Sequence, residues 1–177
     1  MAITSGTFNL VKITSVTYGD STVDGTAPTP LSTMGTIKSG KLNIDFPEPG
    51  TTPEHSEQTQ NPYRIRRSPV MNTATMEIVT SLFSEAVKFL GGTLTETATP
   101  STLVLKSVNT IPNKYVLVTG ENTNGKVVTV ILHNCYVTSS WTGAMGADQE
   151  TVGINVKFNL LQDASADLKV ATITAAF

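Results

Sequence analysis

The segment Thr151–Leu161 alternates between apolar and polar residues, and this alternation constrains the fold more than any other feature of the sequence. Successive side chains of a β-strand point to opposite faces of the sheet. The segment therefore predicts a strand with one buried face and one exposed face. The inward set is Val152, Ile154, Val156, Phe158 and Leu160, and the outward set is Gly153, Asn155, Lys157 and Asn159.

Most of the remaining chain also has the composition of short strands. Phe8–Tyr18 is β-rich with one slip of phase that a bulge would explain. Ile37–Phe46 places Leu42, Ile44 and Phe46 on one face. Asn124-Gly125 predicts a hairpin turn. The other expected strands are Thr93–Thr97, Leu103–Val108, Lys114–Thr119, Lys126–Val137 and Leu168–Phe177, and the expected loops are Gly19–Gly35 and Thr142–Gln149.

One stretch, Thr73–Leu90, has the pattern of an amphipathic helix. At 100° per residue its apolar side chains fill one half of the helix, which indicates a helix that lies flat on a core. Asn72 or Thr73 is the expected N-cap, and Glu77 would lie near the positive end of the helix dipole. Gly91-Gly92 supplies a left-handed stop.

These elements predict a single mainly β domain over residues 1–177, a β-sandwich or barrel with one amphipathic α-helix packed on it. Threonine occurs 29 times and suits exposed strand faces, whereas charged residues make up only 15% of the chain. A net charge of −2 gives no strong field toward nucleic acid or membrane. The single cysteine excludes an internal disulfide and favours a reducing compartment. Neither a signal peptide nor a membrane-spanning segment is expected.

A long proline-rich loop is predicted between Pro47 and Pro69, and its charges are sorted by sign. Loops of this length in compact domains are functional or disordered. We predict that the loop contacts other subunits, with Tyr63 beside its charged residues. The subunit-interface candidates are Glu48, Glu54, Glu57, Tyr63, Arg64, Arg66 and Arg67.

Motifs that would indicate chemistry are incomplete. Gly35–Lys41 has the spacing of a phosphate-binding loop, but Leu42 follows where a hydroxyl is needed, and a strand follows rather than a helix. His133 and Cys135 would share one strand face, but no third metal ligand is evident. We therefore predict no catalytic residue, no metal and no cofactor, and a protein that is not an enzyme.

The order of these elements resembles that of the major tail tube proteins of long-tailed bacteriophages, whose fold is shared with the inner-tube protein of type VI secretion. The resemblance covers roughly Phe8–Phe177: N-terminal strands, a long polar loop, a helix ending in Gly91-Gly92, and the strand pair Val127–Val137 and Thr151–Leu161. It implies a structural virion protein that forms hexameric rings, and the rings stack into a tube through which the genome passes.

The resemblance also implies the partners and the location of the protein. The partners would be other copies of the chain, other tail proteins, and genome DNA in passing through the lumen, with no membrane insertion by the subunit. The protein would be made in the host bacterial cytoplasm and reside in the virion tail. In that family a long loop between early strands mediates stacking, a role that falls here to Pro47–Pro69. The near-neutral charge departs from the family, whose lumens are typically acidic.

Three alternatives remain open on the sequence alone. Another phage structural part, such as a tail completion protein, a connector or a capsid decoration protein, would share the same class. A carbohydrate- or cell-binding β-sandwich module would use Trp141 and the threonine-rich loops. An enzyme would depend on His133 and Cys135. Particle size in solution separates the first class from the others.

Overall fold

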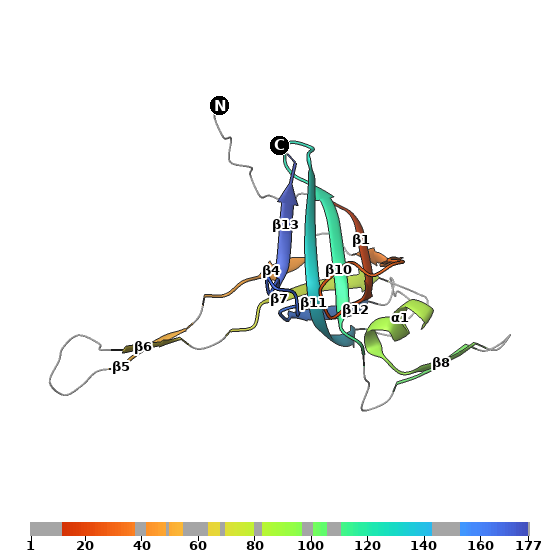
Figure 1. The fold of residues 1–177 in the computed structure, drawn as a ribbon. Coiled ribbons are helices and arrows are strands. Elements are labelled where there is room, and N and C mark those ends of the chain that lie inside the picture. The colour runs from red at the N-terminus through yellow and green to blue at the C-terminus, as the bar shows by residue number, and fades with distance from the viewer. Residues whose placement is uncertain are drawn as a thin grey trace.

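The computed structural model describes residues 12–37, 42–48, 50–54, 64–67, 70–79, 83–96, 101–105, 111–142 and 153–176. Within these residues the chain forms thirteen strands and one helix (Figure 1). In chain order the elements are β1 (Lys12–Asp20), β2 (Ser32–Thr33), β3 (Thr36–Ile37), β4 (Asn43–Asp45), β5 (Thr51–Glu54), β6 (Arg64–Arg67), β7 (Thr73–Val79), α1 (Phe83–Leu90), β8 (Thr93–Glu96), β9 (Ser101–Val104), β10 (Lys114–Glu121), β11 (Val127–Thr142), β12 (Gly153–Leu160) and β13 (Ala171–Ala175).

Nine strands form one antiparallel sheet, and the other four form two hairpins. The sheet has the order β2-β1-β10-β11-β12-β7-β3, with β13 paired to β11 and β4 paired to β7. Strands β5 and β6 form one separate hairpin, and β8 and β9 form the other. Figure 1 shows these two hairpins extending from opposite sides of the central body. The molecule therefore combines a packed β body with two projecting arms.

The long strand β11 holds the body together because its two halves pair with different neighbours. Residues Val127–Leu132 lie between β10 and β13, whereas Cys135–Thr142 pair with β12. A register shift against β10 separates the halves, so the buried face passes from Leu132 to Cys135. A strand that bends at such an irregularity can turn a corner between two layers. The predicted fold class, a mainly β sandwich or barrel with one packed helix, is confirmed.

The prediction of a single helix over Thr73–Leu90 is wrong for its first half. Thr73–Val79 is strand β7, in which Ala74, Met76 and Ile78 are buried in strict alternation. This strand pairs with β12 along one edge and with β3 and β4 along the other. Those long-range hydrogen bonds outweigh the local helical pattern. Asn72 and Thr73 therefore do not cap a helix, and Glu77 lies in a strand rather than near the N-terminus of a helix.

The helix α1 covers only Phe83–Leu90 and packs through Ala86 and Phe89, which are both buried. The hydroxyl of Ser139 in β11 donates a hydrogen bond to the carbonyl of Phe89. The predicted stop is confirmed: Gly91 has φ +70°, and its N–H donates to the carbonyl of Val87 at 2.9 Å.

Several strand predictions are confirmed with changed boundaries. In β12 the residues Ile154, Val156, Phe158 and Leu160 are buried, as the alternation predicts. Of the predicted outward residues Asn155 and Lys157 are exposed, whereas Gly153 and Asn159 are buried. The described part of the first strand begins at Lys12, and its register against β10 shifts between Ile13 and Ser15, which is the expected bulge. The strands predicted at Thr93–Thr97, Leu103–Val108, Lys114–Thr119, Lys126–Val137 and Leu168–Phe177 correspond to β8, β9, β10, β11 and β13.

Other predictions need correction in detail. The loop predicted at Gly19–Gly35 contains the short strand β2, which pairs with Thr17 and Tyr18. The strand predicted at Ile37–Phe46 is present as two pieces, β3 and β4, which pair with opposite ends of β7. The predicted inward Phe46 is 47% exposed, because β4 ends at Asp45 and the chain leaves the sheet there. The proline-rich connection is not a loop throughout, since it contains β5 and β6.

The hairpin predicted at Asn124-Gly125 is confirmed and joins β10 to β11. Gly125 has φ +69°, and its N–H donates to the carbonyl of Asn122 at 3.0 Å. The side-chain oxygen of Asn122 accepts hydrogen bonds from the N–H groups of Asn124 and Lys126, both at 2.9 Å. The turn therefore has three loop residues with glycine in the left-handed position.

Candidate assembly interface

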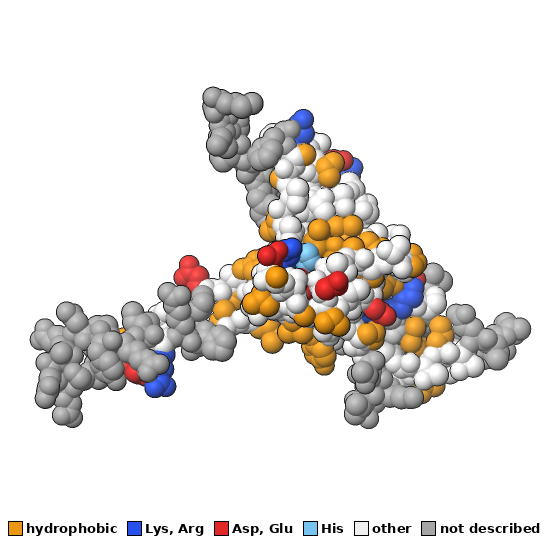
Figure 2. All heavy atoms as spheres, viewed as in Figure 1, with side chains coloured by type: hydrophobic (Ala, Val, Ile, Leu, Met, Phe, Trp, Pro, Cys, Tyr) orange, Lys and Arg blue, Asp and Glu red, His pale blue; other side chains and the backbone are white. Residues whose placement is uncertain are grey.

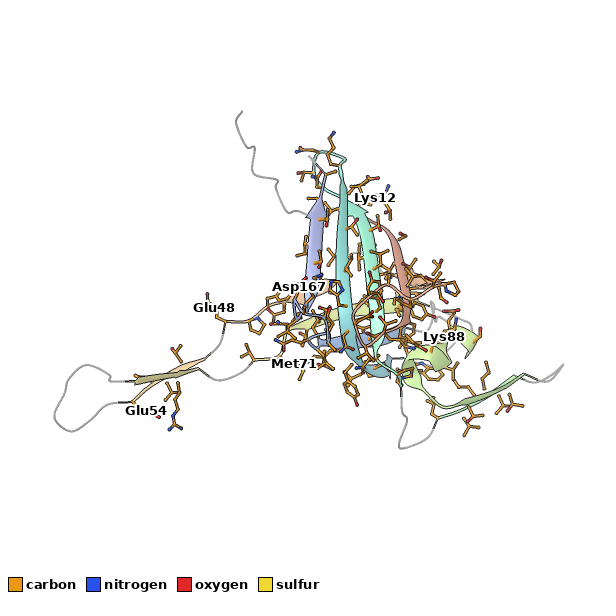
Figure 3. The ribbon with its side chains drawn as sticks, in the orientation of Figure 1. Lys12, Glu48, Glu54, Met71, Lys88 and Asp167 are labelled. Carbon is orange, nitrogen blue, oxygen red and sulfur yellow. The ribbon has the colours of Figure 1, made fainter. Side chains whose placement is uncertain are left out.

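The predicted interface residues are distributed along the β5–β6 hairpin and the segments that lead into it. Glu48 is exposed between β4 and the hairpin, and Glu54 ends β5 (Figure 3). Arg64, Arg66 and Arg67 all belong to β6. Glu57 and Tyr63 lie outside the described residues. The structure thus brings Glu54, from the acidic cluster, onto the strand next to the three arginines.

The register of this hairpin sets how its charges meet. Glu54 is the direct partner of Arg64, and Thr52 is the direct partner of Arg66. The carboxylate of Glu54 forms an ion pair with the guanidinium of Arg66, diagonally across the two strands. Because the Arg66 side chain is 66% exposed, this pair contributes only about 0–1 kcal/mol. Part of the charge set is therefore engaged within the hairpin itself, which the sequence pattern did not predict.

Exposed apolar side chains lie at the base of the hairpin, where sequence reasoning identified no site. Asp45 pairs with Thr73, so the flanking residues Phe46 and Met71 continue from two adjacent strands. Both side chains are about half exposed, and Val70 is also exposed. Figure 2 shows apolar side chains grouped on this face of the body. The sequence analysis expected Phe46 to point inward, and Val70 and Met71 gave no signal because single exposed apolar residues are common on protein surfaces.

His133 has a structural environment rather than that of a metal ligand. Its Nδ1 lies 3.1 Å from the carbonyl oxygen of Gly25, and its Nε2 lies 2.8 Å from the hydroxyl of Thr172. A carbonyl only accepts, so Nδ1 donates to Gly25, and in the neutral ring Nε2 accepts from Thr172. Both ring nitrogens are therefore engaged in joining β11 to β13 and to the loop after β1.

Cys135 belongs to the core and not to a site shared with His133. The expected common face is wrong, because the register shift in β11 places Cys135 in phase with Leu132. Burial raises the pKa of the Cys135 thiol to about 12, so the thiolate needed for nucleophilic attack or metal binding is scarce at neutral pH. No group of three or more His, Cys, Asp or Glu side chains that could hold a metal occurs among the described residues.

The other two candidates are the phosphate-loop spacing at Gly35–Lys41 and Trp141. Thr36 and Ile37 form β3, and Asn43–Asp45 form β4, so strands flank the phosphate-loop spacing. Its residues 38–41 lie outside the described residues. Trp141 lies near the end of β11 opposite the buried Ile154. Within the described part of the chain, no helix has the length and apolar character needed to cross a membrane.

A shallow groove of about 490 Å³ lies on β7, β11 and β12. Five of its nine lining residues carry a hydroxyl or amide group, and Trp141 is not part of it. The aromatic residue expected to stack on a sugar therefore lies elsewhere. The lining residues are Thr75, Met76, Glu77, Thr138, Ser139, Ser140, Asn155, Val156 and Lys157.

Comparison with known proteins gives matches at the level of structure. No protein-family model matches the chain, and no curated protein matches it in sequence. One similar structure is a chain of the sheath–tube complex of an extracellular contractile injection system, PVC, in its extended state. The identity is 7%, the alignment covers 98% of this chain and 95% of that one, and the TM-score is 0.50.

A second similar structure is the tube-terminating cap of the anti-feeding prophage, with 11% identity, coverage of 99% and 100%, and a TM-score of 0.46. At these identities the likeness concerns the fold alone. The described strands and helix, together with the first match, show that this chain has a mainly β fold similar to that of a chain from a contractile injection sheath–tube complex.

Proposed function

We propose that this chain is a structural subunit of a phage-tail-like particle, which assembles into rings that stack into a tube. The fold is similar to that of a chain in a sheath–tube complex, over nearly the full length of both chains. None of the chemical motifs in the described residues has the surroundings that a reaction would need. A structural role therefore accounts for more of the described features than a catalytic one.

The observation that carries the proposal is the projecting β5–β6 hairpin (Figure 1). An isolated two-stranded hairpin is marginally stable in water, so a projecting arm of this kind gains stability when another surface covers it. The arm carries the charge pair of Glu54 and Arg66 and has exposed Phe46 and Met71 at its base. This combination of a polar arm and an apolar base is typical of a subunit contact.

The proposed arrangement is hexameric rings, with the hairpin and its interface candidates Glu48, Glu54, Glu57, Tyr63, Arg64, Arg66 and Arg67 at the contact between rings. A single exposed ion pair contributes little, but repetition around a ring multiplies a weak contact. The partners are other copies of the chain and other tail proteins, and the tube would give passage to a genome. The subunit would reside in the tail of a virion.

Electron microscopy and sedimentation of the purified chain at high concentration test the assembly, and rings or tubes are expected. A variant with Arg64→Glu, Arg66→Glu and Arg67→Glu should remain folded by circular dichroism and fail to stack. The control is Lys12→Glu with Lys126→Glu and Lys157→Glu, which makes the same charge change on exposed lysines of the body. Trypsin should cut the free subunit at the hairpin arginines and cut the assembled form more slowly.

Two results would count against the proposal at different levels. A wild-type chain that stays monomeric at every concentration and salt level would exclude self-assembly. Normal stacking of the triple arginine variant at low and high salt would leave self-assembly intact and exclude the hairpin as the stacking element.

A further inference from the structure

Strand β7 and helix α1 follow each other in a segment whose sequence has the pattern of one continuous helix. Strand β7 ends at Val79, and α1 begins at Phe83. At 100° per residue, Met76, Ile78 and Val79 fall on the same side as Phe89 of α1. The strand therefore occupies a stretch of chain that would also be amphipathic as an extension of the helix.

The contacts that hold β7 as a strand come mostly from far along the chain. All seven residues of β7 pair with β12, from Thr73 opposite Asn159 to Val79 opposite Gly153. Its other neighbours, β3 and β4, are only two and three residues long, and short two-stranded pairings are marginal by themselves. Among the described strands, β7 therefore has no stable partner until β12 is in place.

Local structure forms sooner than this distant pairing. A helix joins residues four positions apart and forms within about 0.1–1 μs, whereas strands about 80 residues apart must first close a long loop. The segment Thr73–Leu90 has 18 residues, which exceeds the length of about 12–15 residues below which isolated helices are marginal. Burial of its apolar side in a collapsed chain stabilises such a helix further.

We propose that Thr73–Leu90 folds first as one continuous helix, and that its first part converts to strand β7 when β12 pairs with it. Helix α1 is the part of this longer helix that remains in the native structure. The conversion exchanges main-chain hydrogen bonds within the helix for hydrogen bonds with β12.

The longer helix protects the segment while β12 is absent. Unpaired strand edges are templates for wrong pairing, whereas a helix pairs its main-chain groups within itself. The side chains of Met76 and Ile78 are buried in β7. In the helix they lie on the side that packs against the collapsed chain, so both states keep them away from water.

Refolding of the full chain from urea, followed by far-ultraviolet circular dichroism, tests the proposal. The early helix signal should correspond to the 18 residues of Thr73–Leu90 rather than to the eight residues of α1, which is about twice the native helix signal. The excess should then decay to the native value as β12 pairs. A signal that approaches the native value without any excess overturns the proposal.

Pulsed hydrogen exchange during refolding locates the early structure. The amides of Thr73–Val79 should become protected before those of Gly153–Leu160, because the helix forms before the two strands pair. If the two sets of amides become protected together, β7 forms directly as a strand and the proposal is wrong. This measurement uses the wild-type chain and depends on no variant.

Substitution of Thr75 tests whether this segment causes the excess helix signal. Thr75 falls on the apolar side of the longer helix, and alanine favours a helix over a strand more than valine does. Thr75→Ala should therefore give a larger and longer-lived excess than Thr75→Val.

Thr138 of β11 provides the matched control. It is an exposed threonine that pairs with Lys157, and Lys157 also pairs with Thr75. Thr138→Ala and Thr138→Val should give the same early helix signal, since Thr138 lies outside the proposed helix. The proposal is overturned if the two Thr75 variants differ no more than the two Thr138 variants.

Discussion

The ring of Tyr18 in β1 packs against the ring of Phe89 in α1, with centroids 4.9 Å apart and planes tilted by 55°. This contact joins the helix to the sheet, and the hydroxyl of Tyr18 also lies 3.5 Å from a carboxylate oxygen of Glu85. Both rings are buried. Aromatic pairs in this tilted arrangement contribute beyond their buried area.

Phe89→Ala should therefore destabilise the fold strongly. A truncated buried phenylalanine costs about 3–5 kcal/mol, because apolar contacts are lost and a cavity remains. Urea unfolding measures the change in the free energy of unfolding. The control is Phe46→Ala, which removes a half-exposed ring and should cost much less. If Phe89→Ala and Phe46→Ala lowered the free energy of unfolding equally, the contact between Tyr18 and Phe89 would not be important for stability.

Gly25 and Gly125 provide a matched test of steric constraint, because both have φ near +70°. A Cβ on Gly25 would clash with a carboxylate oxygen of Asp163, whereas nothing lies within 4 Å of a Cβ on Gly125. Gly125→Ala should cost only the backbone strain, about 1–2 kcal/mol. Gly25→Ala should cost about 1–3 kcal/mol more, since Asp163 must move. Thermal or urea unfolding of both variants checks the difference.

His133→Leu should destabilise the fold by leaving one buried carbonyl and one partly buried hydroxyl without their partner. The groups concerned are the carbonyl of Gly25 and the hydroxyl of Thr172. An unsatisfied buried group costs about 1–3 kcal/mol. Thr172→Val combined with His133→Leu should cost less than the sum of the single changes, because one orphaned group is removed. A double-mutant cycle measures this coupling, and simple additivity would contradict the assigned contact.

Cys135 should make the fold less stable at high pH. Its folded pKa of about 12 lies above the ordinary value of 9.0, so the folded state holds the thiol proton more tightly. The free energy of unfolding should fall as pH rises from about 9 to about 12, by up to about 1.4 kcal/mol per unit. Burial also raises the pKa of Tyr18 and of Tyr115, which act in the same direction. The difference between wild type and Cys135→Ala isolates the thiol contribution, and parallel pH profiles would exclude it.

The fold class could be predicted from the sequence because most strands carry a local signal. In β12 the alternation of Ile154, Val156 and Phe158 with polar residues is complete. The turn before β11 is specified by the side-chain hydrogen bond that Asn122 accepts and by the left-handed backbone of Gly125. Such features depend on neighbouring residues alone, and the structure retains them.

The boundary between β7 and α1 could not be predicted in the same way. Met76 and Ile78 both fall within the apolar half of the helical pattern, yet together with Ala74 they also alternate as the buried face of a strand does. The choice depends on β12, which lies about 80 residues later in the chain, so no local pattern could decide it. The phase of Cys135 relative to His133 was missed for a similar reason, since the bulge in β11 is defined against β10.

The candidate interface was predicted only as a set of charged residues together with Tyr63. The sequence analysis assigned Glu54 and Arg66 to one proline-rich loop that contacts other subunits, but it did not predict that they pair with each other within one hairpin. The place of β13 beside β11 had no local sequence signal either, because position in a sheet is set by the order of distant strands.

The pairing of early strands with strands far later in the sequence has a consequence for how the chain folds during translation. Strand β1 must wait for β10, which follows it by about 100 residues, or roughly 5–20 s at ordinary rates of synthesis. Strand β7 must likewise wait for β12. Threonine-rich strands therefore leave the ribosome with their edges unpaired, and the body can close only when nearly the whole polypeptide has emerged. Chaperones that shield nascent strands would act on this protein during that interval.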